Sequence, residues 1–426
     1  MLEINILRGD RQRVKEGLTK RNFSAERLKL VDDIIDLDDQ RKLVQTNLDQ
    51  MLAKVNTHSK EIGALFKSGK SSEAEVLKQE VVDLKTEIKE LETQQTNIID
   101  QIESALIELP NIPHSSVRQG KGEDDNEVFK AWNGAMPDFS GFEPLPHWDL
   151  AEKHNIIDLK LGVKLTGSGF PVFRGKGAKL ERALINFFLD EAEKAGYEEI
   201  MPPLMVNEDT ARATGQLPDK EGQMYHIERD NFYLIPTAEV PVTNILRGEI
   251  LAAEDLPVKL TGYTPCFRRE AGSYGADVKG LNRVHQFDKV EIVQISHPDQ
   301  SYSALEQMLD HVEQLLTKLE LPYRILRLCG GDLGFTSALT FDFEVYSAAQ
   351  KLWLEVSSVS NFETFQSNRL KLRYRELDSK PQLVHTLNGS ALALARIVAA
   401  ILENNQDEDG VNIPAVLQKF TGFERI

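Results

Sequence analysis

Hydrophobic residues between residues 24 and 108 repeat at the spacing of a coiled coil. This segment contains no proline, and its glycines are Gly63 and Gly69 alone. In its first half the intervals alternate between four and three residues, at Val44, Leu48, Met51 and Val55. In its second half two heptad rows form a seam: Leu77, Leu84, Leu91 and Ile98, with Val81, Ile88, Gln95 and Ile102. Heptads of this kind predict two long helices that pack against each other.

A short polar segment separates the two predicted helices. Residues 66–72, FKSGKSS, place Gly69 and several serines where one helix can end and the next can begin. Each helix has more than thirty residues, and such a helix is about 45–60 Å long at a rise of about 1.5 Å per residue. We therefore predict an antiparallel helical hairpin, too thin for a core of its own and long enough to reach a distant partner.

The remainder of the chain mixes helical and strand patterns. Pro110 and Pro113 end the hairpin, because proline cannot continue a helix. Beyond a linker rich in glycine and charge, the patterns predict helices over residues 178–200, 301–321 and 390–405, and short alternating strands such as KVEIVQI and FDFEVY. This arrangement predicts an α+β fold: a helical hairpin in residues 1–110, then residues 111–426 with a mainly antiparallel sheet flanked by helices.

Composition narrows the classes of function. A length of 426 residues suggests two or three domains. The formal net charge of −17 argues against nonspecific binding of nucleic acid by the whole surface, but an acidic protein can still carry a local basic surface that binds it. The two cysteines, Cys266 and Cys329, exclude a disulfide framework and a cysteine-based zinc site, and they indicate a reducing compartment. An early charged N-terminus and the lack of a long apolar run predict no signal peptide and no membrane span, so we expect a cytoplasmic protein.

Lysines gather near the predicted turn of the hairpin. Lys54, Lys60, Lys67 and Lys70 face one acidic neighbour, Glu61. A solvated coiled-coil surface is the ordinary interpretation of such lysines. A basic tip that contacts phosphates is the alternative, and the spacing alone leaves both open.

The stretch CFRREAGSYGADVKGLNRVHQFDKVE, residues 266–291, carries more charge than a core strand normally does. On a strand Arg268 and Glu270 share one face, and Arg269 lies on the other. The pair could be a simple salt bridge, or Arg268 could bind a phosphate while Glu270 accepts from an amino group of a base. Phe287, in the returning strand, could be a core residue or a platform on which a purine stacks.

Two other clusters have the same ambiguity. Thr237 and Glu239 in IPTAEVPVTN could form a surface turn or a pocket for an ammonium group. Glu355 and Ser357 in WLEVSSVSN share a face of a predicted strand, with Ser358 beside them. Strand serines are often unremarkable, but oxygen ligands of this sort suit Mg²⁺, which takes few protein ligands together with phosphate oxygens.

A third cluster lies near the C-terminus. HTLNGSALALARIV, residues 385–398, runs into a predicted helix and places Arg396 in an otherwise apolar run. A buried charge needs a partner, and an anionic ligand would be one. No GxGxxG or GxxxxGK[ST] motif is present, so neither a dinucleotide fold nor a P-loop is supported.

Taken in order, PTAEVP, TPCFRREAGSYG with HQFDKVE, EVSSVSN and HTLNGSALALAR resemble the motifs of the seryl-tRNA synthetases, which are class II enzymes. The resemblance covers essentially the whole chain and is to the bacterial type. It implies an ATP-dependent ligase that activates L-serine as seryl-adenylate and charges tRNA(Ser), and also tRNA(Sec). It further implies a homodimer, Mg²⁺ with ATP, no zinc, a tRNA-binding arm domain in residues 1–110 and a catalytic domain in residues 111–426.

The resemblance also implies roles for single residues. Catalysis is expected to involve Arg268, Glu270 and Arg396. Serine is expected to contact Thr237, Ala238, Glu239, Arg268, Glu291 and Ser390. ATP is expected to contact Arg268, Arg269, Glu270, Val284, Phe287, Glu355, Val356, Ser357, Ser358 and Arg396. Magnesium is expected at Glu355 and Ser358, and tRNA at Lys54, Lys60, Lys67 and Lys70.

Two rival interpretations remain at this stage. A class II synthetase for threonine or proline is disfavoured by the hairpin, by the lack of an evident zinc-ligand set and by the short sequence after Asn405. A non-enzymatic relative that kept the fold is disfavoured by the joint presence of the implied site residues. One departure concerns Leu354, which stands where the family commonly has an arginine.

Overall fold

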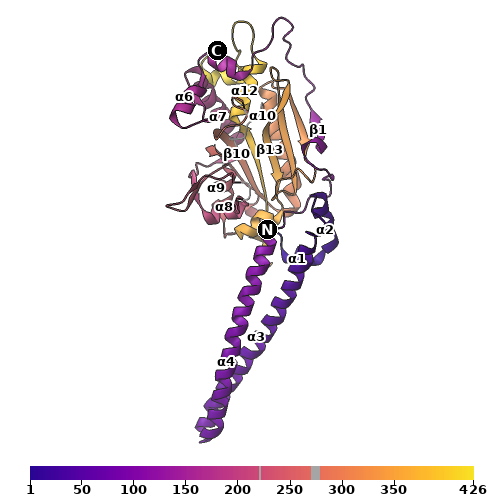
Figure 1. Ribbon diagram of the computed structural model, residues 1–426, viewed down its shortest axis with the longest axis vertical. Helices are drawn as coiled ribbons and strands as arrows, with labels where there is room; N and C mark the ends of the chain where they lie inside the picture. Colours follow the sequence, from indigo (N-terminus) through magenta and orange to yellow (C-terminus); the bar gives the residue numbers. More distant parts are fainter. Residues whose placement is uncertain (220–221, 270–278) are drawn as a thin grey trace. The chain divides into compact units, whose positions relative to one another are not determined.

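The structure, a computed structural model, describes residues 1–219, 222–269 and 279–426. These residues form two compact units, one of residues 1–19 with 23–110 and one of residues 20–22 with 111–426. Figure 1 shows a pair of long helices in the first unit and a large sheet with helices in the second. Among the described residues, no helix is both long and apolar enough to cross a bilayer.

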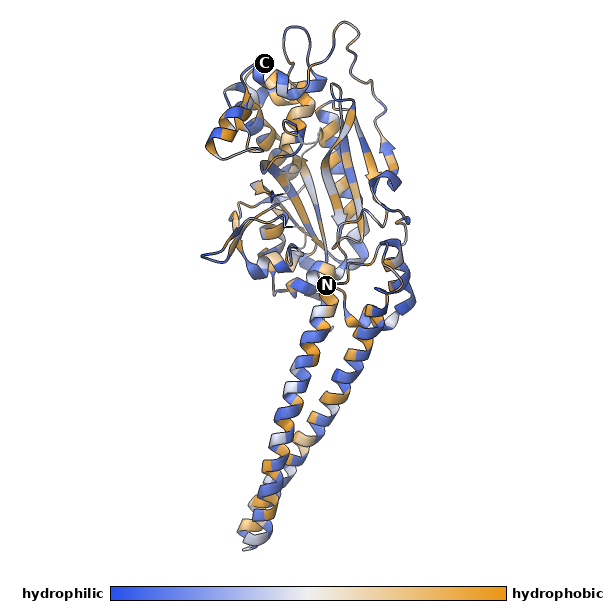
Figure 2. Cartoon of the chain, in the orientation of Figure 1, coloured by the Kyte–Doolittle hydropathy of each residue, from blue (hydrophilic) through white to orange (hydrophobic). Residues whose placement is uncertain are grey.

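The first unit confirms the predicted helical hairpin. Its helices are α1 (Ile4–Gly9), α2 (Arg11–Lys20), α3 (Lys29–Lys67) and α4 (Ser71–Ile107), and α3 and α4 run side by side (Figure 1). Hydrophobic and hydrophilic residues alternate along both (Figure 2). Leu48 and Val81 are among the buried seam residues, and the Gln95 amide donates to the Gln45 side-chain carbonyl across the seam. Gly69 makes the turn with a φ of +73°, a conformation that glycine adopts without strain.

The second unit is built on an eight-stranded sheet, as the predicted α+β fold requires. All neighbouring strands are antiparallel except the short β4, which runs parallel to β9. In spatial order the strands are β1 (Glu127–Ala131), β11 (Tyr323–Arg327), β12 (Leu339–Ser347), β13 (Leu352–Asn361), β16 (His385–Ala393), β10 (Gln286–Ser296), β9 (Val258–Phe267) and β4 (Glu198–Glu199).

Helices bury the core of the second unit against this sheet. Phe187 of α7 (Lys176–Lys194), Leu315 of α10 (Ser301–Lys318) and Ile397 of α12 (Leu394–Asn404) belong to one buried cluster with strand residues such as Val290 and Phe343. Because side chains alternate along a strand, Lys289 and Glu291 of β10 face away from Val290. The opposite face of the sheet is therefore available for a polar site.

Smaller elements surround the sheet. They are α5 (His147–Lys153), β2 (Ile157–Asp158), α6 (Leu159–Leu165), β3 (Val172–Phe173), β5 (Met205–Asn207), α8 (Glu208–Thr214), β6 (His226–Ile227), β7 (Phe232–Leu234), α9 (Glu239–Thr243), β8 (Ile250–Ala252), α11 (Thr364–Leu370), β14 (Arg373–Arg375), β15 (Gln382–Leu383) and α13 (Ala415–Thr421). Helices α9 and α11 contribute to the polar site.

The predicted helix over residues 390–405 begins four residues too early. Residues up to Ala393 belong to β16, which pairs with β13 on one side and with β10 on the other. Alanine and leucine favour a helix locally, but residues 390–393 continue a strand that is paired on both edges at residues 387–389, and their own pairing with β10 stabilises the strand conformation. The predicted helix over residues 178–200 likewise ends at Lys194, before Gly196 turns the chain with a φ of +85°.

Candidate active site

A cavity of about 160 Å³ opens on the polar face of the sheet. Its walls come from β10, β13, β16, the first turn of α12, the segment at residues 281–284 and Arg268, which follows the end of β9. It is lined by Arg268, Leu281, Asn282, Arg283, Val284, Phe287, Lys289, Glu355, Val356, Ser357, Ser390, Ala393, Ala395 and Arg396. Eight of the residues expected to contact ATP or serine are therefore brought together from four stretches of the sequence: residue 268 and residues 284–287, 355–357 and 390–396.

Arg268 and Phe287 face each other in this cavity. The β9–β10 register places Phe287 opposite Cys266, close to the point where Arg268 follows the end of β9. The Arg268 guanidinium lies 5.3 Å from the Phe287 ring centroid, and its Nε donates to the Pro236 carbonyl at 3.3 Å. The guanidinium can bind a phosphate or a carboxylate, and the aromatic ring beside it can stack on a planar base.

Arg396 provides a second oriented guanidinium. Its Nε donates to the Asn282 carbonyl at 3.0 Å, and its Nη1 donates to the Glu355 carbonyl at 2.5 Å. The Glu355 carboxylate lies 3.9 Å from the same nitrogen. Two backbone acceptors from different segments hold this side chain in place, so it is ordered before any anion binds.

A bulge in β13 decides where its polar side chains point. Phe343 pairs with Ser357 but Glu344 pairs with Glu355, so Val356 is an extra residue in the ladder. The Ser357 hydroxyl donates to the Ser390 carbonyl at 2.5 Å. The regular alternation expected from the sequence therefore does not hold across Val356, because a bulge shifts the phase of the strand.

Beyond the bulge, Glu355 and Ser358 line a second, acid-rich cavity of about 580 Å³. Asp342 of β12 lies there opposite Ser358, and its Oδ1 is buried without a hydrogen-bond partner among the described residues. Burial and the nearby Glu355 carboxylate hold the pKa of Asp342 well above its ordinary value. Within the described part of the chain, no group of three or more His, Cys, Asp or Glu side chains could hold a metal ion by itself.

A buried polar cluster adjoins the first cavity. The Glu291 Oε2 accepts from Thr237 and Ser390 hydroxyls, each at 3.3 Å, and pairs with the Lys289 ammonium at 2.8 Å. Thr237 Oγ1 also accepts from the backbone N–H of Glu239 at 3.2 Å. Glu291 lies opposite Ser390 in the β10–β16 register, which explains why residues 99 positions apart share one carboxylate.

Glu239, which is half-buried, is the second carboxylate of this cluster. Gln366 of α11 donates from Nε2 to Glu239 Oε1 at 2.7 Å, while its own Oε1 accepts from Thr386 at 2.8 Å, so the orientation of the amide is determined. Burial and the neighbouring Glu291 raise the pKa of Glu239 to about 7, against the opposing effects of Gln366 and Lys289. Two carboxylates beside one lysine form a pocket suited to a cation.

Comparisons with known proteins agree along the whole chain. Residues 1–113 match the seryl-tRNA synthetase N-terminal domain, and residues 225–405 match the class II tRNA synthetase core domain of the G, H, P, S and T group. The serine–tRNA ligase of Salinibacter ruber is 53% identical over 435 residues, spanning 100% of this chain and 99% of that protein. The chain belongs to the serine–tRNA ligase family.

Solved structures agree with this family membership. The seryl-tRNA synthetase of Pyrococcus horikoshii, complexed with ATP, matches with a TM-score of 0.94 at 36% identity, over 100% of this chain and 99% of that one. The cytoplasmic serine–tRNA ligase of Naegleria fowleri, in complex with AMP, matches with a TM-score of 0.89 at 25% identity, over 100% and 98%. Among the relatives compared by sequence, the serine–tRNA ligase of Geobacter sulfurreducens is 45% identical, over 99% of each chain.

Some residues that the family resemblance implied lie outside the first cavity. Glu270 is not among the described residues. Arg269 does not line the cavity, and its guanidinium lies 6.0 Å from the Tyr225 ring. Ala238 is buried in a hydrophobic cluster with Val242 and its neighbours, so its backbone is the part that could face a ligand.

The structure also adds residues that the sequence did not identify for this serine–tRNA ligase family member. Lys289 is 6% exposed and neutralises Glu291; its place in HQFDKVE, in phase with Phe287, was a usable signal. Gln366 orients Glu239, and Asn282 orients Arg396. Neither of these two carries a sequence signal, because each acts through a contact between distant segments.

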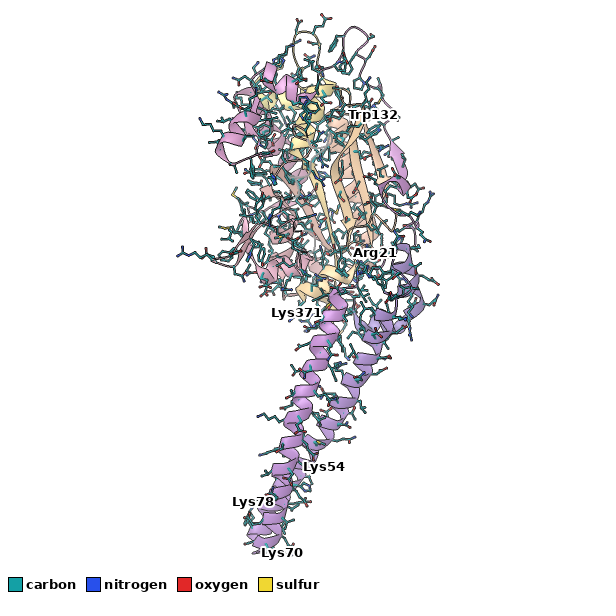
Figure 3. All side chains as sticks on the ribbon, in the orientation of Figure 1. Arg21, Lys54, Lys70, Lys78, Trp132 and Lys371 are labelled. Atoms are coloured by element: carbon teal, nitrogen blue, oxygen red, sulfur yellow. The ribbon has the colours of Figure 1, made fainter. Side chains whose placement is uncertain are left out.

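In the helical unit, Lys54, Lys60, Lys67 and Lys70 are all exposed. Figure 3 labels Lys54 along the far half of the hairpin and Lys70 at its turn. Lys70 forms an ion pair with Glu73 at 3.1 Å, and such an exposed pair adds little stability. The four lysines that the family resemblance implies for tRNA contact are therefore accessible within this unit.

Proposed function

We propose that this member of the serine–tRNA ligase family activates L-serine with ATP to form seryl-adenylate, and then transfers the seryl group to the 3′ end of tRNA(Ser). The observation that carries the proposal is the juxtaposition of a cavity bearing Arg268, Phe287 and Arg396 with the carboxylates of half-buried Glu239 and buried Glu291. A nucleotide and an amino acid can then bind side by side, with the reacting carboxylate near the α-phosphate.

In the first step, the serine carboxylate attacks the α-phosphorus of ATP and pyrophosphate leaves. Arg268 would bind the carboxylate and the α-phosphate, Phe287 would stack on adenine, and Arg396 would bind the distal phosphates. In the second step, the terminal ribose hydroxyl of tRNA takes the seryl group and AMP leaves. Neither step needs a strong side-chain acid or base, so positioning and charge stabilisation carry the catalysis.

Magnesium would accompany ATP in this site. Glu355 and Ser358 are the residues that would hold it, since Mg²⁺ binds proteins through one or two oxygen ligands and completes its shell with phosphate oxygens and water. The Asp342 Oδ1 in the same cavity supports the fit, because this buried oxygen has no hydrogen-bond partner among the described residues and a cation could interact with it. When bound, the ion would neutralise charge on the phosphates.

Selectivity for serine would come from the groups around its side chain. Glu291, Thr237 and Ser390 form a buried hydrogen-bonding set that a substrate hydroxyl can join. A site of this kind strongly rejects analogues without the hydroxyl, because its own polar groups would then lose a partner. Glu239 would receive the substrate ammonium.

Pyrophosphate exchange with each of the twenty amino acids tests this function against its rivals. Exchange with serine alone is the expected result. Exchange with threonine or proline would identify another class II specificity, and no exchange with any amino acid would favour a non-catalytic role.

The pKa of Glu239 predicts how serine binding depends on pH. The carboxylate is ionised above about pH 7, and only the ionised form pairs with an ammonium. We expect the KM for serine to fall about tenfold per unit as the pH rises towards 7, and to level off above it. Glu239→Gln should bind serine weakly with no such dependence, while the KM for ATP serves as the control. A flat profile in the wild-type enzyme would contradict the assignment.

The two parts of the chain would divide the work. Residues 1–110 would bind tRNA through the hairpin, and residues 111–426 would form the catalytic domain of a homodimer. Charging of tRNA(Sec) would use the same arm and site as charging of tRNA(Ser). The enzyme would act in the cytoplasm, where these tRNAs are used.

A further inference from the structure

A buried hydrogen-bond network adjoins the first cavity, where ATP is proposed to bind. It joins α12, the start of α5 and the segment at residues 347–350. Glu403 of α12 is fully buried, and its Oε1 accepts from the backbone N–H of His147 at 3.0 Å and lies 2.7 Å from the Nδ1 of the same residue. Ser347 donates to its other oxygen, and Gln350 donates to Oε1 at 2.9 Å. Although burial alone raises a carboxyl pKa, these hydrogen bonds hold the pKa of Glu403 below its ordinary value. Glu403 is thus a buried, ionised carboxylate with hydrogen-bond donors at both of its oxygens.

The partners of His147 determine which of its nitrogens carries the proton. The backbone N–H of Leu281 donates to His147 Nε2 at 2.8 Å. Nε2 must therefore be the acceptor, and Nδ1 carries the hydrogen that is donated to Glu403. His147 is buried completely, so no water competes for either contact. Gly280 fits closely against this ring: a Cβ there would lie 2.2 Å from Nε2.

The network ends at groups that line the ATP cavity. Leu281 and Asn282 are both part of its wall. Asn282 donates to the Gln350 side-chain carbonyl at 2.7 Å, and its backbone carbonyl accepts from Arg396 Nε at 3.0 Å. The contacts therefore run without a gap from Glu403, through His147 and Gln350, to the arginine proposed to bind the phosphates of ATP.

We propose that His147 is a positioning residue for ATP. His147 accepts a hydrogen bond from the Leu281 N–H and is itself bonded to Glu403 of α12, so it links the segment at residues 281–284 to that helix. This link fixes the position of the Asn282 backbone carbonyl, which in turn orients Arg396. His147 itself does not line the cavity. The inference rests on the proposed binding of ATP there, and it adds a residue whose effect passes through the wall of the site.

Two substitutions separate this role from a purely structural one. In His147→Asn, the amide nitrogen replaces Nδ1 and keeps the bond to Glu403, but the acceptor for Leu281 is lost. In His147→Gln, the amide oxygen replaces Nε2 and keeps the acceptor, but the bond to Glu403 is lost. We expect His147→Asn to raise the KM for ATP about tenfold or more in serine-dependent pyrophosphate exchange. His147→Gln should stay within about twofold of the wild type despite a lower Tm, with the KM for serine unchanged in both.

Equal values of KM for ATP in the two variants, or a wild-type value in His147→Asn, would overturn the proposal. Gln350→Ala provides a second measurement if either variant fails to fold, because it removes the side chain that holds Asn282 and keeps the His147 acceptor for the Leu281 N–H; an unchanged KM for ATP there would also count against the proposal. His154→Gln is the matched control, since His154 Nε2 has no hydrogen-bond partner among the described residues. Serine-dependent exchange by the wild type tests the proposed function separately.

Discussion

Arg268→Ala is expected to reduce seryl-adenylate formation by about a thousandfold or more. The guanidinium is held beside Phe287 by the Pro236 carbonyl, so it is oriented before substrates arrive. Its loss would leave the charge that develops between the carboxylate and the α-phosphate without its main partner, and losses of this order follow when such a preorganised group is removed. The measurement is serine-dependent pyrophosphate exchange, with kcat and KM determined separately.

Two further variants test this interpretation. Arg268→Lys keeps the charge but not the planar pair of donors, so it should recover only a small part of the activity. Arg229→Ala removes an exposed arginine of the same unit and should exchange at the wild-type rate. Near-normal exchange by a folded Arg268→Ala protein, with its Tm unchanged, would refute the role assigned to Arg268.

Deletion of residues 54–85 is expected to abolish efficient tRNA charging while sparing adenylate formation. Gln45 and Gln95 contact each other across the hairpin, so the ends left by the deletion, residues 53 and 86, lie eight and nine positions beyond this contact, at nearly matching levels, and a short turn can join them. The deletion removes the exposed lysines at the far end of the arm and whole heptads of the seam. The kcat/KM for tRNA should fall about a hundredfold or more, while pyrophosphate exchange stays within about twofold.

A second variant separates the effect of the lysine charges on tRNA binding from the effect of the length of the hairpin. Replacing Lys54, Lys60, Lys67 and Lys70 together by alanine keeps the helices but removes four exposed cations. If these side chains meet phosphates, the variant should lose affinity for tRNA and show a shallower dependence of affinity on salt concentration. Wild-type charging by the deletion variant would mean that the arm does not recruit tRNA.

The sequence by itself determined those features that depend on local patterns. Heptads in residues 44–102 specify the hairpin, because a repeat of about 3.5 residues leaves one apolar stripe per helix and each stripe must be buried. The alternation around Arg268 and Phe287 likewise predicts two paired strands, which β9 and β10 confirm. The candidate site residues came from motifs, and most of them proved to line a common cavity or to join the buried cluster beside it.

Only the tertiary structure decided the features that depend on pairing between distant segments. Residues 390–393 are strand rather than helix because they continue β16, which β13 and β10 pair on both sides at residues 387–389 and β10 alone pairs up to Ala393, against their local preference. The bulge at Val356 sets the direction of Glu355 and Ser358, and it exists only relative to β12. The raised pKa of Glu239 needs both burial and the nearness of Glu291, two properties that no single stretch of sequence contains. Local propensity is a weak energy per residue, and the summed pairing and burial of the folded sheet outweigh it.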